Sequence, residues 1–168
     1  MVIDATEVLA VIQAVEKAGL VISLDGGWGV DALLGRQHRD HDDLDVVVDA
    51  THIVAFQRVL ASLGFFVAED YLPTRLVLRT VDGRQVDVHP VTFDGDGIGW
   101  QTGAGPDGGA CPYPAAGFTT GLVAGRSVGC LTAQLQVEHH RGYHPTDRDR
   151  DDLWLLAESF DLVLPPPY

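Results

Sequence analysis

Several residue types that mark particular classes of protein are scarce in this sequence. Cys111 and Cys130 are the only cysteines among 168 residues. That is too few for a disulfide scaffold, so we expect reduced thiols and a cytoplasmic protein. Neither cysteine stands in a Cys-x-x-Cys motif or beside an evident base, and a catalytic thiol is therefore not expected.

Long apolar runs are missing as well. No stretch approaches the roughly 20 apolar residues that a membrane-spanning helix needs. The N-terminal segment MVIDATEVLAVIQ has no basic region before its apolar residues, whereas a signal peptide begins with such a region. We therefore expect no membrane segment and no signal peptide.

Basic residues are few, with 11 Lys and Arg against 24 Asp and Glu, which gives a formal net charge of −13. Affinity for DNA or RNA depends on neutralising phosphates, so this balance excludes a generic nucleic-acid binder. An acidic surface favours cationic partners and metal ions, or serves solubility alone.

An internal repeat and a clean linker are also lacking. The length fits one domain that can bury a real core. We therefore predict a single domain over residues 1–168, with a core over about 1–92 and a loop, a hairpin and C-terminal helices over about 93–168.

What the sequence does contain is an alternation of helical and strand patterns, which predicts an α+β or α/β domain with a mixed sheet. Helices are expected from a cap at Asp4 or Thr6 to Gly19, up to Leu34, from Thr51 to Gly64, from Thr132 to about His140, and over 147–160. Strands are expected over 20–24, 44–48, 65–69, 74–80, 84–89, 118–124 and 126–130. A turn is expected at Gly142 and Pro145, and the Gly- and Pro-rich stretch 91–117 is expected to be a long, functional loop.

Two acids stand at the start of the strand over residues 44–48. Side chains alternate along a strand, so Asp43 and Asp45 point to the same face, with roughly 6–7 Å between their Cα atoms. Two carboxylates beside the Gly26-Gly27 turn suit a hard cation that carries a polyphosphate. Asp-x-Asp alone is weak support, because acid-rich loops are usually solvated turns or helix caps.

Two further features strengthen this hypothesis. Gly26 and Gly27 follow a predicted strand and precede a short helix, where backbone N–H groups can approach a phosphate closely. Asp87 interrupts the apolar strand Val86-Asp87-Val88, and a buried acid needs a partner or a metal. If this strand lies beside the one over 44–48, the three carboxylates converge.

At this point the sequence resembles a known family. The run DGGWGVDALLGRQHRDHDDLDV resembles the lincosamide and aminoglycoside 2''-nucleotidyltransferases, which inactivate antibiotics and belong to the polymerase-β-like superfamily. The likeness extends to Pro73 and Arg75, to VDVHP, and to the pattern from Ala133 to Leu153, and is weakest over 94–117. It implies a mixed sheet flanked by helices, with a short C-terminal helical portion.

The resemblance also implies roles for the acids. Asp43 and Asp45 would hold Mg²⁺ on a nucleoside triphosphate, and Asp87 would be the general base or a further metal ligand. Arg39, a forked cation just before the acids, would neutralise triphosphate oxygens. Gly26 and Gly27 would cradle phosphate. The implied reaction transfers a nucleoside monophosphate, AMP from ATP, to a hydroxyl and releases pyrophosphate.

The acceptor is less determined than the reaction. The single-domain length resembles the lincosamide enzymes, whereas the net charge of −13 favours a cationic acceptor such as an aminoglycoside. Two rival functions stay open: a nucleotidyltransferase that modifies a protein or RNA partner, and a non-catalytic metal-binding module. The second rival needs a spaced set of oxygen ligands, which HDDLD does not supply. A homodimer whose second subunit completes the acceptor pocket is a further expectation.

Other polar residues carry weaker hypotheses. His38 and His41 are expected in a solvated loop rather than in a transition-metal site. Asp31 is expected to pair with a nearby arginine, Arg36 or Arg39. Arg75 is expected to reach phosphate or to pair with a surface acid. Trp28 is expected to serve packing. The acids at the start of the last helix are expected to cap it, namely Asp147, Asp149, Asp151 and Asp152.

Overall fold

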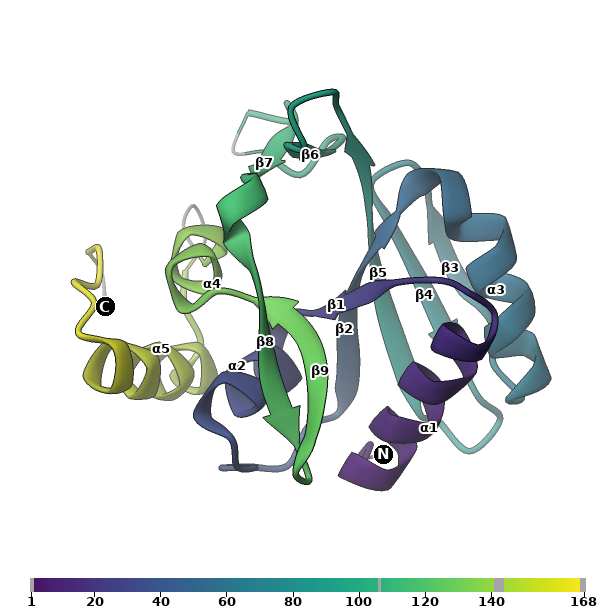
Figure 1. The fold of residues 1–168 in the computed structure, drawn as a ribbon, viewed down its shortest axis with the longest axis horizontal. Coiled ribbons are helices and arrows are strands. Elements are labelled where there is room, and N and C mark those ends of the chain that lie inside the picture. Colours follow the sequence, from purple (N-terminus) through teal and green to yellow (C-terminus); the bar gives the residue numbers. More distant parts are fainter. Residues whose placement is uncertain (1, 106, 141–143, 167–168) are drawn as a thin grey trace.

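The computed structural model describes residues 2–105, 107–140 and 144–166, and Figure 1 shows its fold. Its helices are α1 (Ala5–Lys17), α2 (Gly26–Leu34), α3 (Ile53–Ser62), α4 (Ala133–His139) and α5 (Asp147–Phe160), with short 3-10 turns η1 (Ala50–His52) and η2 (Ala115–Gly117). Its strands are β1 (Ile22–Leu24), β2 (Asp43–Asp49), β3 (Phe66–Tyr71), β4 (Arg75–Arg79), β5 (Gln85–Phe93), β6 (Gly99–Gln101), β7 (Cys111–Tyr113), β8 (Phe118–Val123) and β9 (Arg126–Leu131). No helix of the described part is long and apolar enough to cross a membrane.

The strands form one mixed sheet in the order β3-β4-β5-β2-β1-β9-β8, with β6 and β7 attached beyond β5. Strands β2 and β5 are parallel neighbours at the centre, and β1 also pairs in parallel with β9. The other neighbouring strands are antiparallel. The predicted α+β fold with a mixed sheet is confirmed.

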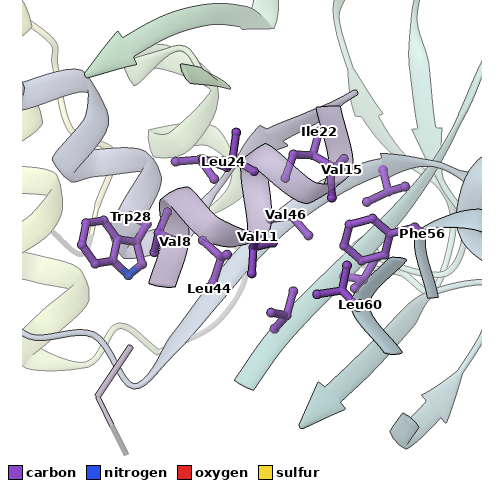
Figure 2. Close-up of a cluster of buried hydrophobic side chains, with 14 of the residues drawn as sticks. Val8, Val11, Val15, Ile22, Leu24, Trp28, Leu44, Val46, Phe56 and Leu60 are labelled. Atoms are coloured by element: carbon purple, nitrogen blue, oxygen red, sulfur yellow. The ribbon is translucent and has the colours of Figure 1, made fainter. Parts of the chain in front are cut away.

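Alternation along β2 separates the core from the site. Leu44, Val46 and Val48 are buried in the main hydrophobic cluster, where they meet the apolar faces of α1 and α3 (Figure 2). Burying each such side chain stabilises the fold by about 1.5–3 kcal/mol. Asp43 and Asp45 occupy the intervening positions and therefore point to the opposite face of the sheet.

Three helices begin where the sequence predicts. Asp4 caps α1 in a capping box with Glu7, and Thr132 caps α4 by accepting a hydrogen bond from the Leu135 N–H. Helix α5 spans the predicted residues. The prediction that Thr51 caps the second long helix is wrong, because Asp49 caps the 3-10 turn there and α3 starts at Ile53.

The middle segment differs from the prediction of a long loop over 91–117. Strand β5 continues to Phe93, and two strands of three residues each follow: β6 pairs with the end of β5 and with β7. Strands this short carry almost no periodicity in the sequence, and they form because a neighbouring strand supplies their hydrogen bonds. The predicted turn at Gly142 lies outside the described residues.

Candidate active site

The three acids singled out in the sequence lie together on one face of the central strands. In the parallel register of β2 and β5, Asp45 is the direct partner of Asp87. Ligand atoms of Asp45, Asp87 and His89 all lie within 4.8 Å of one another. Burial, together with the charges of Asp45 and Asp87, raises the pKa of Asp43 to about 6. The structure therefore brings the three predicted carboxylates together.

A cavity of about 630 Å³ opens over these acids. The sheet contributes Asp43, Asp45 and His89 to its wall, and the loop before β4 together with β4 contributes Thr74 and Arg75. The rest of its lining includes side chains from β6, β7, the C-terminal end of α4 and the first turn of α5, namely Gln101, Cys111, Tyr113, His139, His140, Arg148 and Asp149. Part of the segment over 91–117, which was predicted to be a functional loop, thus lines the cavity, and the residues that do so include members of strands β6 and β7.

The two glycines stand where α2 meets the acids. Gly26 is the first residue of α2 and has a φ of +54°, a left-handed value that favours glycine. A Cβ atom on Gly26 would collide with the Asp45 carboxylate, and one on Gly27 would lie 2.6 Å from the Arg39 Nη2 atom. Asp25 caps the helix by accepting the Gly26 N–H at 2.8 Å. Both glycines therefore keep the backbone close to the acids and to Arg39, as a phosphate site at a helix N-terminus requires.

Arg75 pairs with Asp87 rather than with a surface acid. The Arg75 Nε atom lies 2.8 Å and 2.9 Å from the two Asp87 oxygens, and the Nη2 atom also contacts Oδ2. The Asp87 side chain is only 6% exposed, whereas that of Arg75 is 42% exposed. The buried acid predicted to need a partner or a metal therefore has an arginine as its partner.

His89 is a site residue that the sequence analysis missed. Its Nε2 atom lies 3.5 Å from Asp45 Oδ1. Burial lowers the pKa of His89, but contact with Asp45 and the charges of Asp25 and Asp87 outweigh it and raise the pKa to about 9. The signal was present, because positions 87 and 89 share one face of a strand.

Gln101 and Tyr113 orient this histidine from β6 and β7. The Gln101 amide nitrogen donates to the Thr74 carbonyl at 2.9 Å and faces His89 Nδ1 at 3.1 Å, while its oxygen accepts the Tyr113 hydroxyl at 2.7 Å. For the neutral ring, an amide nitrogen facing Nδ1 favours the tautomer with its hydrogen on Nε2, and the protonated ring, which the raised pKa favours, also carries a hydrogen there. In either form the Nε2 hydrogen points toward Asp45, so His89 supports Asp45 and is not itself a metal ligand.

The donor set fits a hard divalent cation. Asp43 and Asp45 offer carboxylate oxygens on the cavity wall, which are the ligands that Mg²⁺ prefers. The raised pKa of Asp43 reports the repulsion that such a cation would relieve. Asp87 lies close enough to join them once Arg75 leaves its oxygens. The residues present therefore fit Mg²⁺.

Arg39 lies on the cavity wall and is held by Asp152 of α5. Its Nε and Nη2 atoms donate to the two Asp152 oxygens at 2.9 Å and 2.6 Å. The prediction that Asp152 caps the last helix is wrong, because Asp152 is buried and also accepts from His38 Nε2 at 2.7 Å. Asp149, in contrast, forms a capping box with Thr146.

The prediction that the two histidines before the acids are solvated is wrong, because His41 is buried and the His38 side chain is only 9% exposed. His41 Nε2 lies 2.5 Å from Asp31 Oδ2, and His38 Nδ1 contacts Asp31 Oδ1. These histidines take the place of the arginine that was expected to pair with Asp31. Trp28, which packs against His41 with ring centroids 4.8 Å apart, is 2% exposed and serves packing as predicted.

Comparison with known proteins agrees with the resemblance seen in the sequence. The family model for aminoglycoside-2''-adenylyltransferase matches residues 7–156. A lincosamide resistance protein of Staphylococcus haemolyticus is 31% identical over 147 residues, which cover 88% of this chain and 90% of that protein. A 2''-aminoglycoside nucleotidyltransferase of Escherichia coli is 29% identical over 132 residues, which cover 76% of this chain and 68% of that protein.

Solved structures show the same fold. The crystal structure of the lincosamide antibiotic adenylyltransferase LnuA with bound lincomycin has a TM-score of 0.82 and 29% identity, covering 93% of this chain and 98% of that one. The fold is shared with ANT(2'')-Ia in complex with adenylyl-2''-tobramycin, at a TM-score of 0.74 and 20% identity, covering 93% and 88% of the two chains. With the family model, the curated relatives and the fold in agreement, the chain belongs to the aminoglycoside-2''-adenylyltransferase family of nucleotidyltransferases.

Proposed function

We propose that this protein transfers AMP from ATP to a hydroxyl group of a lincosamide-type antibiotic, with Mg²⁺ as its cofactor, and so inactivates the drug. The observation that carries the proposal is the convergence of Asp43, Asp45 and Asp87 beside the N-terminus of α2, at the base of a cavity. The family of the chain supports the reaction class, and its lincosamide relatives support the acceptor.

The triphosphate would lie along the start of α2. Gly27 is the second residue of that helix, where backbone N–H groups favour an anion. Arg39 lies beside Gly27, and its positive charge would attract phosphate oxygens, while Asp152 holds its Nε and Nη2 atoms and the Asp40 carbonyl accepts from Nη1 at 3.0 Å. Holding the triphosphate at these two places aligns its α-phosphorus with the acids.

The carboxylates would bind the metal and receive the proton. Asp43 and Asp45 would hold Mg²⁺, and Asp87 would accept the proton of the attacking hydroxyl or add a third ligand. Bound there, Mg²⁺ supplies positive charge that stabilises the attacking and leaving oxygens of an in-line displacement. His89 would keep Asp45 oriented through its Nε2 hydrogen, with Gln101 fixing the tautomer.

The choice of acceptor rests on the relatives rather than on the charge of the cavity. Asp42 pairs with Arg148 at 2.8 Å and Asp152 pairs with Arg39, whereas Asp25 and Asp149 accept from uncharged groups and keep their negative charge. The lining is therefore acidic enough for an acceptor with one or several positive charges, and the 31% identity to the lincosamide resistance protein favours the first. A lincosamide carries one amine, whereas an aminoglycoside carries several.

An aminoglycoside is the second candidate acceptor, favoured by the family model. The test is mass spectrometry after incubating the protein with Mg²⁺, the four nucleoside triphosphates, and a panel of lincosamides and aminoglycosides. We expect a lincosamide heavier by one AMP, formed from ATP and abolished by EDTA. An aminoglycoside product would replace the first candidate with the second. A labelled protein or RNA, with no labelled drug, would contradict both.

The number of subunits is a separate proposal. We propose a homodimer in the cytoplasm, in which a second subunit borders the open side of the acceptor cavity. Sedimentation at micromolar concentration tests this proposal. A monomer that is fully active at the same concentration would contradict it.

A further inference from the structure

Arg75 is paired with Asp87, and the proposed reaction gives this arginine no role. Asp87 is the partner of Val77 in the antiparallel register of β4 and β5. Arg75 lies two residues before Val77, on the same face of the sheet, and reaches Asp87 diagonally. Both oxygens of Asp87 accept hydrogen bonds from its guanidinium. A cation that binds Asp87 therefore has to compete with this guanidinium.

Arg75 also separates Asp87 from the cavity. Among the described residues that line the cavity, Arg75 is present and Asp87 is absent, although Asp43 and Asp45 are both there. The Asp87 side chain is 6% exposed beneath an arginine that is 42% exposed. A divalent ion that reaches Asp43 and Asp45 from the cavity therefore meets Asp87 only after the guanidinium moves.

The guanidinium has an alternative partner on the cavity side. It faces the space in which the proposed triphosphate would lie, and a forked guanidinium matches phosphate oxygens as well as it matches a carboxylate. A triphosphate carries several negative charges, whereas Asp87 carries one. Binding a nucleotide would therefore draw Arg75 from Asp87 toward the phosphates.

We propose that Arg75 is an internal counter-ion that occupies Asp87 in the nucleotide-free protein and moves to the phosphates when the nucleotide binds, so that metal and nucleotide bind cooperatively. This proposal rests on the function proposed above. Without nucleotide, Arg75 and the metal compete for the same carboxylate. With nucleotide, the competition ends and the complete set of acids becomes available. Arg75 is thus a positioning residue that sets the order in which the site fills.

The chain offers a matched control on the same strand. Arg79 also lies on β4, with the same face and the same side-chain exposure of 42% as Arg75. It donates to Gln85 at 2.8 Å and to Glu69 at 2.8 Å, and it does not line the cavity. Replacing Arg79 with Gln removes the same charge from β4 and leaves Asp87 paired.

The test measures binding of Mn²⁺ to the full chain by electron paramagnetic resonance, which counts the free ion and needs no turnover. It compares the wild type, Arg75→Gln and Arg79→Gln, each with and without an ATP analogue whose α,β-bridging group is a methylene. Without nucleotide, we expect Arg75→Gln to bind Mn²⁺ at least about tenfold more tightly, since hydrogen bonds to charged groups have about this strength. Arg79→Gln should match the wild type.

Linkage gives a second readout from the same titrations. In the wild type the analogue should tighten Mn²⁺ binding strongly, and in Arg75→Gln this gain should shrink by the factor already gained without nucleotide. Arg75→Lys, which keeps the charge but loses the forked contact, should lie between the wild type and Arg75→Gln. If thermal denaturation shows that Arg75→Gln does not fold, Arg75→Lys replaces it in the test.

The outcomes separate this proposal from the function on which it rests. If the wild type binds Mn²⁺ with the analogue but Arg75→Gln shows no tighter binding without it, the counter-ion is contradicted and the proposed function is untouched. If none of the proteins binds Mn²⁺ under any condition, the metal site of the proposed function is contradicted as well. Tighter binding in both Arg75→Gln and Arg79→Gln would also overturn the proposal, because general surface charge would then explain the effect.

Discussion

Two clusters of buried and half-buried carboxylates adjoin the start of α2, and they differ in how their charge is balanced. The first, which we call the catalytic cluster, consists of Asp43, Asp45, Asp87, His89 and Arg75. It adjoins Gly26, whose Cα faces the Asp45 carboxylate. Among the described arginines, Arg75 alone pairs with one of its three acids, and its histidine lies 3.5 Å from Asp45.

The second, which we call the positioning cluster, consists of Asp31, His38, Arg39, His41 and Asp152. It adjoins Gly27, which faces Arg39 and His41. Each of its two carboxylates accepts hydrogen bonds from two cationic or imidazole side chains. The negative charge of the positioning cluster is therefore balanced by the protein's own side chains, whereas the catalytic cluster keeps an excess of negative charge.

The ionisation of the two clusters shows the same contrast. Burial raises the pKa of Asp152, but hydrogen bonds from Arg39 and His38 outweigh it, so the net shift is downward. Burial also raises the pKa of Asp43, and there the charges of neighbouring acids add to it and bring the pKa to about 6. A buried acid with a complete set of partners holds a structure together. A buried group of acids without one is suited to an external cation.

The largest expected effect is the loss of turnover on replacing Asp45 with Asn. This change removes a proposed metal ligand and leaves the backbone hydrogen bond from the Asp25 N–H to the Asp45 carbonyl intact. We expect kcat to fall at least about a thousandfold, because charge neutralisation by a metal is worth several kcal/mol. Circular dichroism should show an intact fold. The assay follows release of pyrophosphate at saturating Mg²⁺.

Asp42→Asn is the matched control for this prediction. Asp42 is the exposed neighbour of Asp43, and its partner Arg148 is exposed as well, so their ion pair contributes at most about 1 kcal/mol. The variant should keep most of its turnover. Wild-type turnover by Asp45→Asn would show that the catalytic cluster does not hold the metal.

The next largest effect is expected for Asp87→Asn. We expect nucleotide binding to persist and kcat to fall by about 10²–10⁴, the range that general acid–base catalysis contributes. A titration with the ATP analogue measures binding, and single-turnover kinetics measure the chemical step. An unchanged chemical step would remove Asp87 from the role of base and leave it as the partner of Arg75.

The sequence predicts the catalytic cluster better than the positioning cluster, because members of the catalytic cluster can be recognised from local patterns in the chain. The acids at 43, 45 and 87 were found because alternation on a strand is a local pattern, and the parallel register of β2 and β5 then joins them. His89 obeys the same alternation and was available to the same reasoning. The α+β fold was predictable for a similar reason, since helix caps and apolar periods are local signals.

The positioning cluster was not predictable in the same way. Asp152 and Arg39 are 113 residues apart in the chain, and only the packing of α5 beside α2 brings them together. An acid in the first turns of a helix is normally a cap, so local reasoning assigned Asp152 that role. Asp31 has two arginines and two histidines nearby in the sequence, and its partners depend on the path of the loop before β2, which no local pattern specifies.

A smaller effect, on stability rather than chemistry, is expected for Asp152→Ala. This change leaves Arg39 and His38 without the carboxylate that joins them. Breaking a buried ion pair on one side costs about 3–5 kcal/mol, and we expect the lower end because the Arg39 side chain is 24% exposed. Urea denaturation measures the loss. KM for ATP should rise as well, since Arg39 is no longer held.

Asp151→Ala is the control, because Asp151 is the exposed neighbour of Asp152 on α5. It should change stability by no more than about 0.5 kcal/mol. Equal losses of stability in the two variants would mean that Asp152 contributes no more than an exposed acid at the start of α5.

The smallest effect distinguishes the two clusters by the sign of their response to pH in the metal-free protein. The pKa of Asp43 is raised to about 6 in the folded state, so its favourable contribution to stability is complete below about pH 3.8 and is lost as the pH rises through 6. The pKa of Asp152 is lowered, so its contribution is present above about pH 3.8 and is lost as the pH falls through the folded-state value. In EDTA, the stability of Asp43→Asn relative to the wild type should therefore rise as the pH increases from 4 to 8. The stability of Asp152→Asn relative to the wild type should fall as the pH increases toward about 4 and then stay nearly constant.

Thermal unfolding of the three proteins from about pH 2 to pH 8 measures both differences. Adding Mg²⁺ at pH 8 should stabilise the wild type more than Asp43→Asn, because the cation relieves the repulsion that the variant has already removed. The stability of Asp152→Asn relative to the wild type should respond little to Mg²⁺, because its partners are arginine and histidine. If the stabilities of both variants relative to the wild type changed in the same direction with pH, the two clusters would not differ in charge balance. The argument that the catalytic cluster binds an external cation would then be contradicted.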